Sequence, residues 1–287
     1  MMTDHQKGTT MNNSIHLLHS QNGRQMQSLL ITTEDGKVIA VDGGWRADAA
    51  YFISYLQEIT GQDVPHVDAW FLTHPHQDHI DAFLEVMQNW KDALTVDTVY
   101  YNFPSVQYFS RTSEPDASAE KTTREFYEAL PLFADKVCIV SGGDVIKVGE
   151  AKFEILYSPE WDIDRNICNN ASIVFKMTLG ERTALILGDC GVEAGERILA
   201  HYGESGILHC DICQMAHHGQ RGVNKAFYEA VRPEICLWCT PKWLWNNDRG
   251  NGFNTHHFET VTVRGWMEEL GVKTNYVEMD GTQVCQL

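Results

Sequence analysis

The sequence has no long run of apolar residues. Its uninterrupted apolar stretches are as short as Ala184 to Leu187, whereas a helix that spans a bilayer needs about 20 such residues. The first 13 residues are polar and lack the apolar stretch of about 7–15 residues found in secretory signals. We therefore expect no membrane association, a cytoplasmic location, a loosely ordered tail over residues 1–13 and a single domain over residues 14–287.

Basic residues are scarce. The chain has 22 Lys and Arg against 39 Asp and Glu, which gives a formal net charge of −17. Binding to extended nucleic acid needs a basic face, so we expect a small-molecule substrate instead. The apolar fraction of 43% is typical of a folded globular protein and excludes general disorder. The sequence does not indicate an oligomeric state.

Two pairs of cysteines have the spacing of a zinc ribbon but lack its Gly-rich turns. Cys210 and Cys213 form the first C-x2-C pair, and Cys236 and Cys239 form the second. Both pairs lie in apolar segments that read as strands, where residues three apart point to opposite faces. We therefore predict small buried hydrophobic residues at these positions and no disulfides.

The hydrophobic pattern predicts many strands with helices between groups of them. A polar, aromatic-containing loop is expected over residues 104–119, and a helix over 81–90. Consecutive strands with interspersed helices favour an α+β architecture, in which two mixed β-sheets pack face to face with helices outside. Catalytic residues should then lie on loops at one end of the sheets.

The segment with the strongest chemical signal follows an apolar strand at residues 69–72. It places His74, His76, Asp78 and His79 within six residues, ahead of a helical pattern. His74 and His76 point to the same side of an extended turn, while Asp78 and His79 can aim at a second point nearby. Imidazole and carboxylate groups are ligands for Zn, Mn and Fe. The pattern therefore predicts two ligand pairs for two cations.

This H-x-H-x-D-H pattern resembles that of the metallo-β-lactamase-fold hydrolases. The resemblance implies an αββα sandwich and a binuclear metal site, with His74 and His76 on the first metal and Asp78 and His79 on the second. An apolar strand ending in Gly-Asp resembles the family's position for a carboxylate that bridges both metals, which implies that role for Asp189.

A later His-His-Gly segment is similar to the final ligand motif in the branch that includes the hydrolase domain of DNA-uptake competence proteins. Adjacent histidines on extended backbone face opposite ways, so one of His217 and His218 should bind metal. The other would orient substrate or protonate the leaving group, and the pattern does not decide between them. The same branch carries an Asn-rich stretch before Gly-Asp, here Asn169 and Asn170.

Two features depart from the family pattern. The chain has no histidine between His79 and His201, so Asn169, Asn170 or water would replace a third imidazole on the first metal, which leaves Mn or Fe as alternatives to Zn. After His-His-Gly the branch usually has serine, whereas this chain has Gln220-Arg221, and the Arg221 guanidinium group can bind an anionic substrate oxygen.

Aromatic and histidine residues near the C-terminus suggest a substrate pocket. Trp243 lies in a segment rich in Pro, Asn and Gly, and His256 and His257 precede the last expected helix. We expect Trp243 to form a wall of the pocket and His256 or His257 to contact the substrate.

The resemblance implies a hydrolase that uses a metal-bridging hydroxide, with Asp78 holding this nucleophile in line and Asp81 orienting His79. We expect a small phosphoester or phosphodiester substrate, and thus a phosphodiesterase-type enzyme with two divalent metal ions, zinc preferred. A lactone, thioester or amide substrate is the first alternative, because the same metal pair serves each. A non-hydrolytic metal-binding protein or an iron-dependent oxidative member of the fold is the second.

Overall fold

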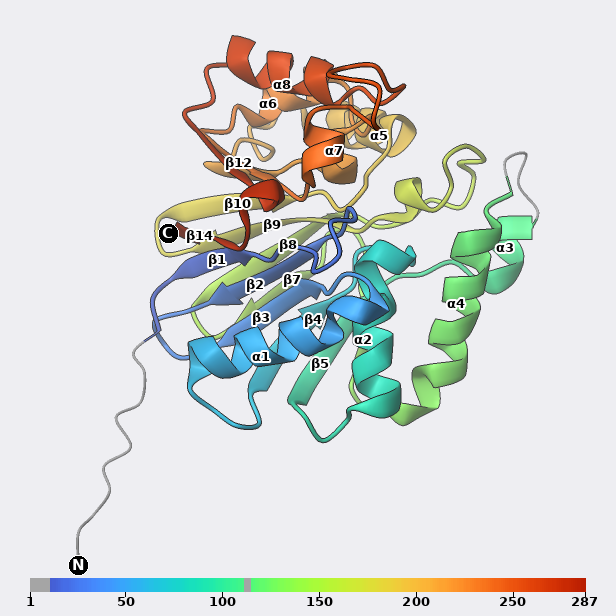
Figure 1. Ribbon diagram of the computed structural model, residues 1–287, viewed down its shortest axis with the longest axis vertical. Helices are drawn as coiled ribbons and strands as arrows, with labels where there is room; N and C mark the ends of the chain where they lie inside the picture. Colours follow the sequence, from blue (N-terminus) through green and yellow to red (C-terminus); the bar gives the residue numbers. More distant parts are fainter. Residues whose placement is uncertain (1–10, 111–114) are drawn as a thin grey trace, which may run out of the picture.

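The computed structural model describes residues 11–110 and 115–287. Two seven-stranded sheets pack face to face, and helices cover both outer faces (Figure 1). The predicted αββα sandwich is confirmed. Of the tail expected over residues 1–13, residues 1–10 lie outside the described part. No helix in the described part is long and apolar enough to cross a membrane.

The first sheet has the strand order β14-β1-β2-β3-β4-β5-β6. Its strands are β1 (Ser14–Leu17), β2 (Ser28–Thr32), β3 (Val38–Asp42), β4 (His66–Phe71), β5 (Thr95–Tyr101), β6 (Val137–Ile139) and β14 (Gln283–Gln286). The pairs from β14 to β3 are antiparallel, and those from β3 to β6 are parallel. The carboxyl ends of β3 and β4 therefore meet at one edge of the sheet.

The second sheet has the order β13-β12-β11-β10-β9-β8-β7. Its strands are β7 (Val145–Val148), β8 (Ala151–Tyr157), β9 (Val174–Leu179), β10 (Arg182–Ile186), β11 (Ile212–Gln214), β12 (Ile235–Trp238) and β13 (Thr274–Val277). The pairs from β10 to β13 are parallel, so the loops that follow β10, β11 and β12 also share one edge.

Alternating side chains on each strand separate an inner core from two outer ones. On β4, Ala69 and Phe71 face the space between the sheets, while Trp70 and Leu72 pack under the helices. The ring of Phe71 lies 4.8 Å from the rings of both Phe153 and Phe175, measured between centroids. These contacts hold the two sheets together close to the segment that follows β4.

Helices on each face are amphipathic and bury one side. The first sheet is covered by α1 (Ala49–Thr60), α2 (Gln77–Asn89) and α4 (Ala117–Ala129), and the second by α5 (Val192–Tyr202), α6 (Lys225–Val231) and α8 (Thr260–Glu269). Two short helices, α3 (Val106–Ser110) and α7 (Lys242–Trp245), lie in connecting segments.

The structure corrects two local predictions. Helix α2 begins at Gln77 rather than at residue 81, so Asp78 lies in its first turn, where a carboxylate is favoured by the helix dipole. The loop predicted over 104–119 contains α3 and the start of α4, because Phe109 is fully buried against Ala119. Asp116 caps α4 by accepting a hydrogen bond from the Ala119 N–H at 2.9 Å.

The paired cysteines are buried, as predicted. Cys236 packs under the helices and Cys239 between the sheets, so the second pair points to opposite faces. Cys210 and Cys213 share the outer cluster, because Cys210 precedes β11. Among the described residues, none of the four belongs to a group that could hold a metal ion.

Candidate metal centre

The segment after β4 brings its histidines and its aspartate to the edge between the sheets. The first group is built on His74, which is fully buried, and His76; the Nε2 atom of His74 lies 3.0 Å from the Nδ1 atom of His76. The second group joins Asp78 and His79 to His218 from the loop after β11. The Nε2 atom of His218 lies 3.3 Å both from Asp78 Oδ2 and from His79 Nε2.

Asp189, from the turn after β10, lies between these two groups. Its carboxylate oxygens are 3.7 Å from His74 Nε2, 3.2 Å from His79 Nε2 and 3.4 Å from His218 Nε2. Burial alone would raise the pKa of Asp189, but the positive charges of His218, His79 and His74 hold it well below its usual range. A carboxylate in this position can serve both groups at once.

Each imidazole of the two groups uses one ring nitrogen on a partner outside the centre. The pairs are His74 Nδ1 with the Thr73 hydroxyl at 3.1 Å, His76 Nε2 with Asp116 at 3.1 Å, His79 Nδ1 with Asp42 at 2.7 Å and His218 Nδ1 with the Cys239 carbonyl at 3.0 Å. The second nitrogen of every ring is thereby directed to the shared centre. Such outer partners orient the imidazole ligands of metal sites.

Asp42, not Asp81, orients His79, so the expectation for Asp81 is wrong. Asp42 ends β3 and is fully buried, and it also accepts hydrogen bonds from Gln27 and from the Thr73 N–H and hydroxyl at 2.7–2.9 Å. The Asp81 carboxyl has an unpartnered buried oxygen, and burial raises its pKa to about 6. In the sequence, only the turn Asp42-Gly43-Gly44 distinguished Asp42 from other acidic residues.

His217 and His218 were expected on extended backbone, with their rings on opposite sides. The structure shows a different backbone conformation. Both are in the left-handed region, with φ of 52° for His217 and 55° for His218. That conformation costs about 1–2 kcal/mol per residue. It turns the His218 ring into the buried centre, while the His217 ring stays partly exposed, with Nδ1 3.0 Å from the Arg221 carbonyl and Nε2 3.3 Å from the Asn169 amide.

The remaining predicted site residues lie in different places. Asn170 binds the start of α5, where it accepts from the Ala194 N–H at 3.0 Å and donates to Glu193 at 2.9 Å. The Arg221 side chain is exposed and lies 3.8 Å from Glu259. His256 and His257 lie on an exposed to half-buried loop, and neither lines the cleft described next.

A cleft of about 410 Å³ opens over the centre. Its lining includes His76, Asp78, Asp189, His217 and Trp243, together with Arg24, Gln25, Trp45 and Arg249. The guanidinium groups of Arg24 and Arg249 lie 3.7 Å above the rings of Trp45 and Trp243, respectively. Sequence reasoning identified Trp243 but missed both arginines, which carry no motif.

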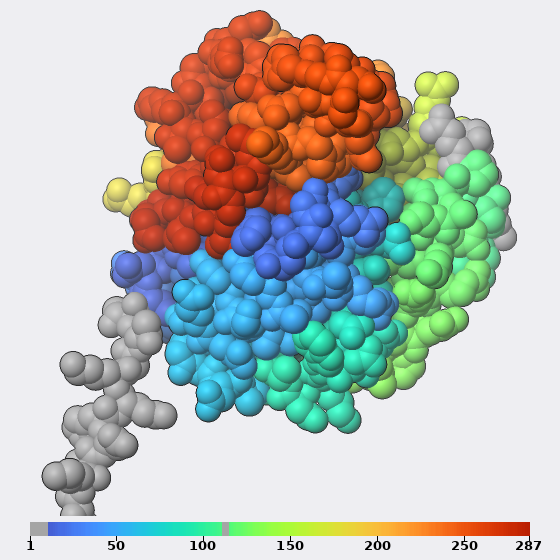
Figure 2. All heavy atoms as spheres, viewed as in Figure 1, coloured from blue at the N-terminus to red at the C-terminus, as the bar shows by residue number. Residues whose placement is uncertain are grey.

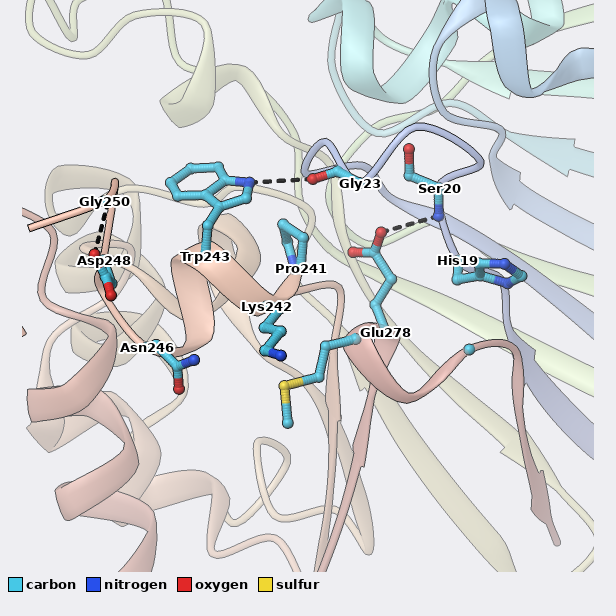
Figure 3. Close-up of a pocket in the computed structure, with 12 residues that line it drawn as sticks. His19, Ser20, Gly23, Pro241, Lys242, Trp243, Asn246, Asp248, Gly250 and Glu278 are labelled. Atoms are coloured by element: carbon cyan, nitrogen blue, oxygen red, sulfur yellow. Dashed lines mark hydrogen bonds between the residues drawn. The ribbon is translucent and has the colours of Figure 1, made fainter. Parts of the chain in front are cut away.

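Trp243 also lines a second cavity of about 470 Å³ (Figure 3). Its indole N–H donates to the Gly23 carbonyl at 3.2 Å, and Glu278 accepts from the Ser20 N–H at 3.0 Å. Burial raises the pKa of Glu278 to about 8. The metal-binding groups found among the described residues include none of this cavity's lining, so the smaller cleft is the candidate active site. In Figure 2 the blue N-terminal segment lies against the orange and red C-terminal part, and the second cavity is lined by residues from both.

Comparison with known proteins agrees with this fold. Residues 22–156 match the family model of the metallo-beta-lactamase superfamily. ComE operon protein 3 of Bacillus subtilis (strain 168) is 24% identical over 181 residues, which make up 62% of this chain and 20% of that protein. The chain has the metallo-beta-lactamase fold. It spans about a fifth of that competence protein.

Solved structures share this fold at low sequence identity. CmlA, a diiron beta-hydroxylase from Streptomyces venezuelae, has a TM-score of 0.54 at 13% identity, over 96% of this chain and 54% of its own. YhfI from Bacillus subtilis has a TM-score of 0.54 at 11% identity, over 96% and 100%. Zn(2+)-bound PqqB from Methylobacterium extorquens has a TM-score of 0.53 at 12% identity, over 92% and 88%.

The residues of the centre fit the divalent metal ions that the fold implies. Asp189 is 1% exposed, and its Oδ1 atom lies 3.2 Å from His79 Nε2 without forming a hydrogen bond, although buried carboxylate oxygens are normally hydrogen-bonded. Imidazole nitrogens and carboxylate oxygens converge beside that oxygen, and such a donor set suits Zn, Mn and Fe.

Gly188 allows Asp189 to reach the centre. Its φ is +54°, and a Cβ atom there would lie 2.9 Å from Thr73 Cβ and 3.0 Å from Ser172 Oγ. We expect Gly188→Ala to lower the free energy of unfolding by more than the about 1–2 kcal/mol that the left-handed backbone costs an alanine, and to weaken metal binding. Gly180→Ala is the matched control, because Gly180 has φ of +59° and nothing within 4 Å. Equal urea midpoints for the two variants would contradict this explanation.

Proposed function

We propose that the chain is a binuclear metal-dependent hydrolase of small phosphate esters, with phosphodiesters as the preferred class. The observation that supports this most strongly is the composition of the cleft. Two arginines line it together with the metal-ligand candidates Asp78 and Asp189, in a chain whose net charge is −17. The cleft therefore combines cation ligands with binding groups for an anion.

Six side chains would hold the two cations. His74 and His76 belong to the first, Asp78, His79 and His218 to the second, and Asp189 to both. Two divalent cations, zinc preferred, would supply an acidified water as nucleophile and would stabilise the negative charge that develops on the phosphate oxygens. The outer partners of the imidazoles keep their free nitrogens directed at the centre, which reduces the reorganisation needed during reaction.

Asp78 and His217 have roles beyond ligation. Gln25 donates a hydrogen bond to Asp78 Oδ2 at 3.0 Å, which fixes the carboxylate on the cleft side, where it can orient the attacking water. The His217 ring lines the cleft and holds a proton at Nδ1, which faces the Arg221 carbonyl. Its Nε2 atom, which lies 3.3 Å from the Asn169 amide, would exchange a proton with the leaving group.

Arg24 and Arg249 favour phosphate over neutral acyl substrates. A planar guanidinium group matches two oxygens of a phosphate group, and stacking on an indole ring fixes its plane. A lactone, thioester or amide carries no such pair of anionic oxygens and would gain little from two arginines.

Metal analysis and a substrate screen test this function. Protein loaded with zinc or manganese should hold close to two ions per chain and should turn over bis-p-nitrophenyl phosphate faster than a lactone or a thioester. A single iron per chain without ester hydrolysis would favour the oxidative alternative, and preferred turnover of a lactone or thioester would contradict the phosphoester assignment.

Removing either arginine should affect anionic substrates selectively. We expect Arg24→Ala and Arg249→Ala each to lower kcat/KM for bis-p-nitrophenyl phosphate by about 10–100-fold, because a hydrogen bond to a charged group contributes about 1.5–3 kcal/mol. Any residual turnover of a neutral lactone should not change. Arg124→Ala is the matched control, since Arg124 pairs with Glu120 on the exposed face of α4. Equal losses on charged and neutral substrates would contradict the phosphate-binding role.

A further inference from the structure

The first cation has fewer ligands in this chain than the second. His74, His76 and a shared Asp189 provide three, whereas Asp78, His79, His218 and the shared Asp189 provide four. Of the two asparagines that the sequence suggested as replacements, Asn170 binds the start of α5. The Asn169 NH₂ group faces His217 and Asn166, while its buried Oδ1 atom has no hydrogen-bond partner and is a competing oxygen donor.

Cys168 lies where the missing ligand should be. Its sulfur and one ring nitrogen each of His74 and His76 all lie within 4.8 Å of one another. A tetrahedral zinc ion, with Zn–S about 2.3 Å and Zn–N about 2.0–2.1 Å, holds its ligand atoms about 3–4 Å apart. The three atoms are therefore grouped on the scale of one coordination sphere.

The local fold fixes this cysteine beside the histidine pair. Cys168 is 2% exposed and packs against Phe109 and Ala119 at the start of α4. The residue that caps α4, Asp116, faces His76 Nε2 at 3.1 Å. The same turn of helix therefore positions both the sulfur and the imidazole. Asp189 Oδ2 lies 3.7 Å from His74 Nε2, which brings a fully buried carboxylate to the same histidine.

We propose that Cys168 is a thiolate ligand of the first metal ion, which completes a His74, His76, Cys168 and Asp189 site. This inference rests on the two-metal centre proposed above. A thiolate donor favours zinc and disfavours manganese, so it replaces the expectation of Mn or Fe at this position. The ligand change also places an oxidisable group within the centre, since the thiolate is the reactive form of cysteine.

Cobalt substitution tests the sulfur ligand directly. Protein loaded with two equivalents of Co²⁺ should show thiolate-to-cobalt charge-transfer absorption in the near ultraviolet. Cys168→Ala and Cys168→Ser should lose this absorption and bind the first ion at least about tenfold more weakly. Cys213→Ser is the matched control, because Cys213 is fully buried on β11 and should keep the absorption. Persistence of the absorption in Cys168→Ala, or its absence from the wild-type protein with two ions bound, would overturn the proposal.

A second measurement uses the wild-type chain and does not depend on the folding of any variant. The zinc X-ray absorption spectrum of the protein loaded with two zinc ions should contain a sulfur scatterer at about 2.3 Å. A first shell made only of nitrogen and oxygen would contradict ligation. Charge-transfer absorption and a sulfur scatterer without ester hydrolysis would support the ligand and refute the proposed function, whereas phosphodiester hydrolysis without either signal would do the reverse.

Discussion

Asp189→Asn is expected to lower phosphodiester hydrolysis by about a thousandfold. In the proposed centre the Asp189 carboxylate would help to hold both cations, and Lewis-acid stabilisation by a metal pair is worth several kcal/mol, with each 1.36 kcal/mol equal to a factor of ten in rate. The variant should also lose at least one of its two bound ions. Turnover of bis-p-nitrophenyl phosphate and metal content after gel filtration measure the two effects.

The comparison for Asp189→Asn is Glu196→Gln, which removes one carboxylate charge from the exposed face of α5. This control should retain both metal ions and full activity. Asparagine has nearly the shape of aspartate, so the far-ultraviolet circular dichroism of Asp189→Asn should match that of the wild type. Two tightly bound ions and near-normal rates in Asp189→Asn would remove the central carboxylate from the mechanism.

Asp42→Asn is expected to weaken metal binding by about 10–100-fold, the usual range for loss of an outer partner of a ligand. Asp42 is fully buried and acts only as an acceptor toward Gln27, Thr73 and His79. An asparagine would turn its NH₂ group toward one of these donors, at a cost of about 1–3 kcal/mol for an unsatisfied buried group. The His79 ring would then lose its fixed orientation.

Zinc titration with a competing chelator measures the effect of Asp42→Asn, and urea unfolding of the metal-free protein separates the loss of stability from the loss of affinity. Asp81→Asn is the matched control, because Asp81 is also a buried acid near the centre but does not contact His79. If both variants bound zinc equally well, Asp42 would have no part in orienting the ligand.

The sequence was most informative where the chemistry is local. His74, His76, Asp78 and His79 lie within six residues, so a single turn after one buried strand brings them together whatever the rest of the chain does. The strand ends at Asp189 and at His217 were placed by resemblance to the family pattern, and the parallel pairing of β10 with β11 brings those ends to the same edge.

Residues that act through tertiary contacts could not be found in this way. Asp42 precedes His79 by 37 positions and Asp116 follows His76 by 40, and neither has a sequence signature. Arg24 and Arg249 both line the cleft although they are far apart in the sequence. The neighbouring segments are joined by the hydrogen bond from the Trp243 indole to the Gly23 carbonyl. The segment around Phe109 was likewise predicted as a polar loop but forms a helix, because the packing of this buried side chain outweighs local propensity.

The ligand candidates come from both layers of the sandwich: four follow β4 in the first sheet, and Asp189 and His218 follow β10 and β11 in the second. Ions bound by these side chains would link the two layers, and their binding energy would add to the cohesion of the folded state. A partly synthesised chain that ends before residue 218 lacks His218, so the proposed centre would be complete only after the chain has grown past that residue.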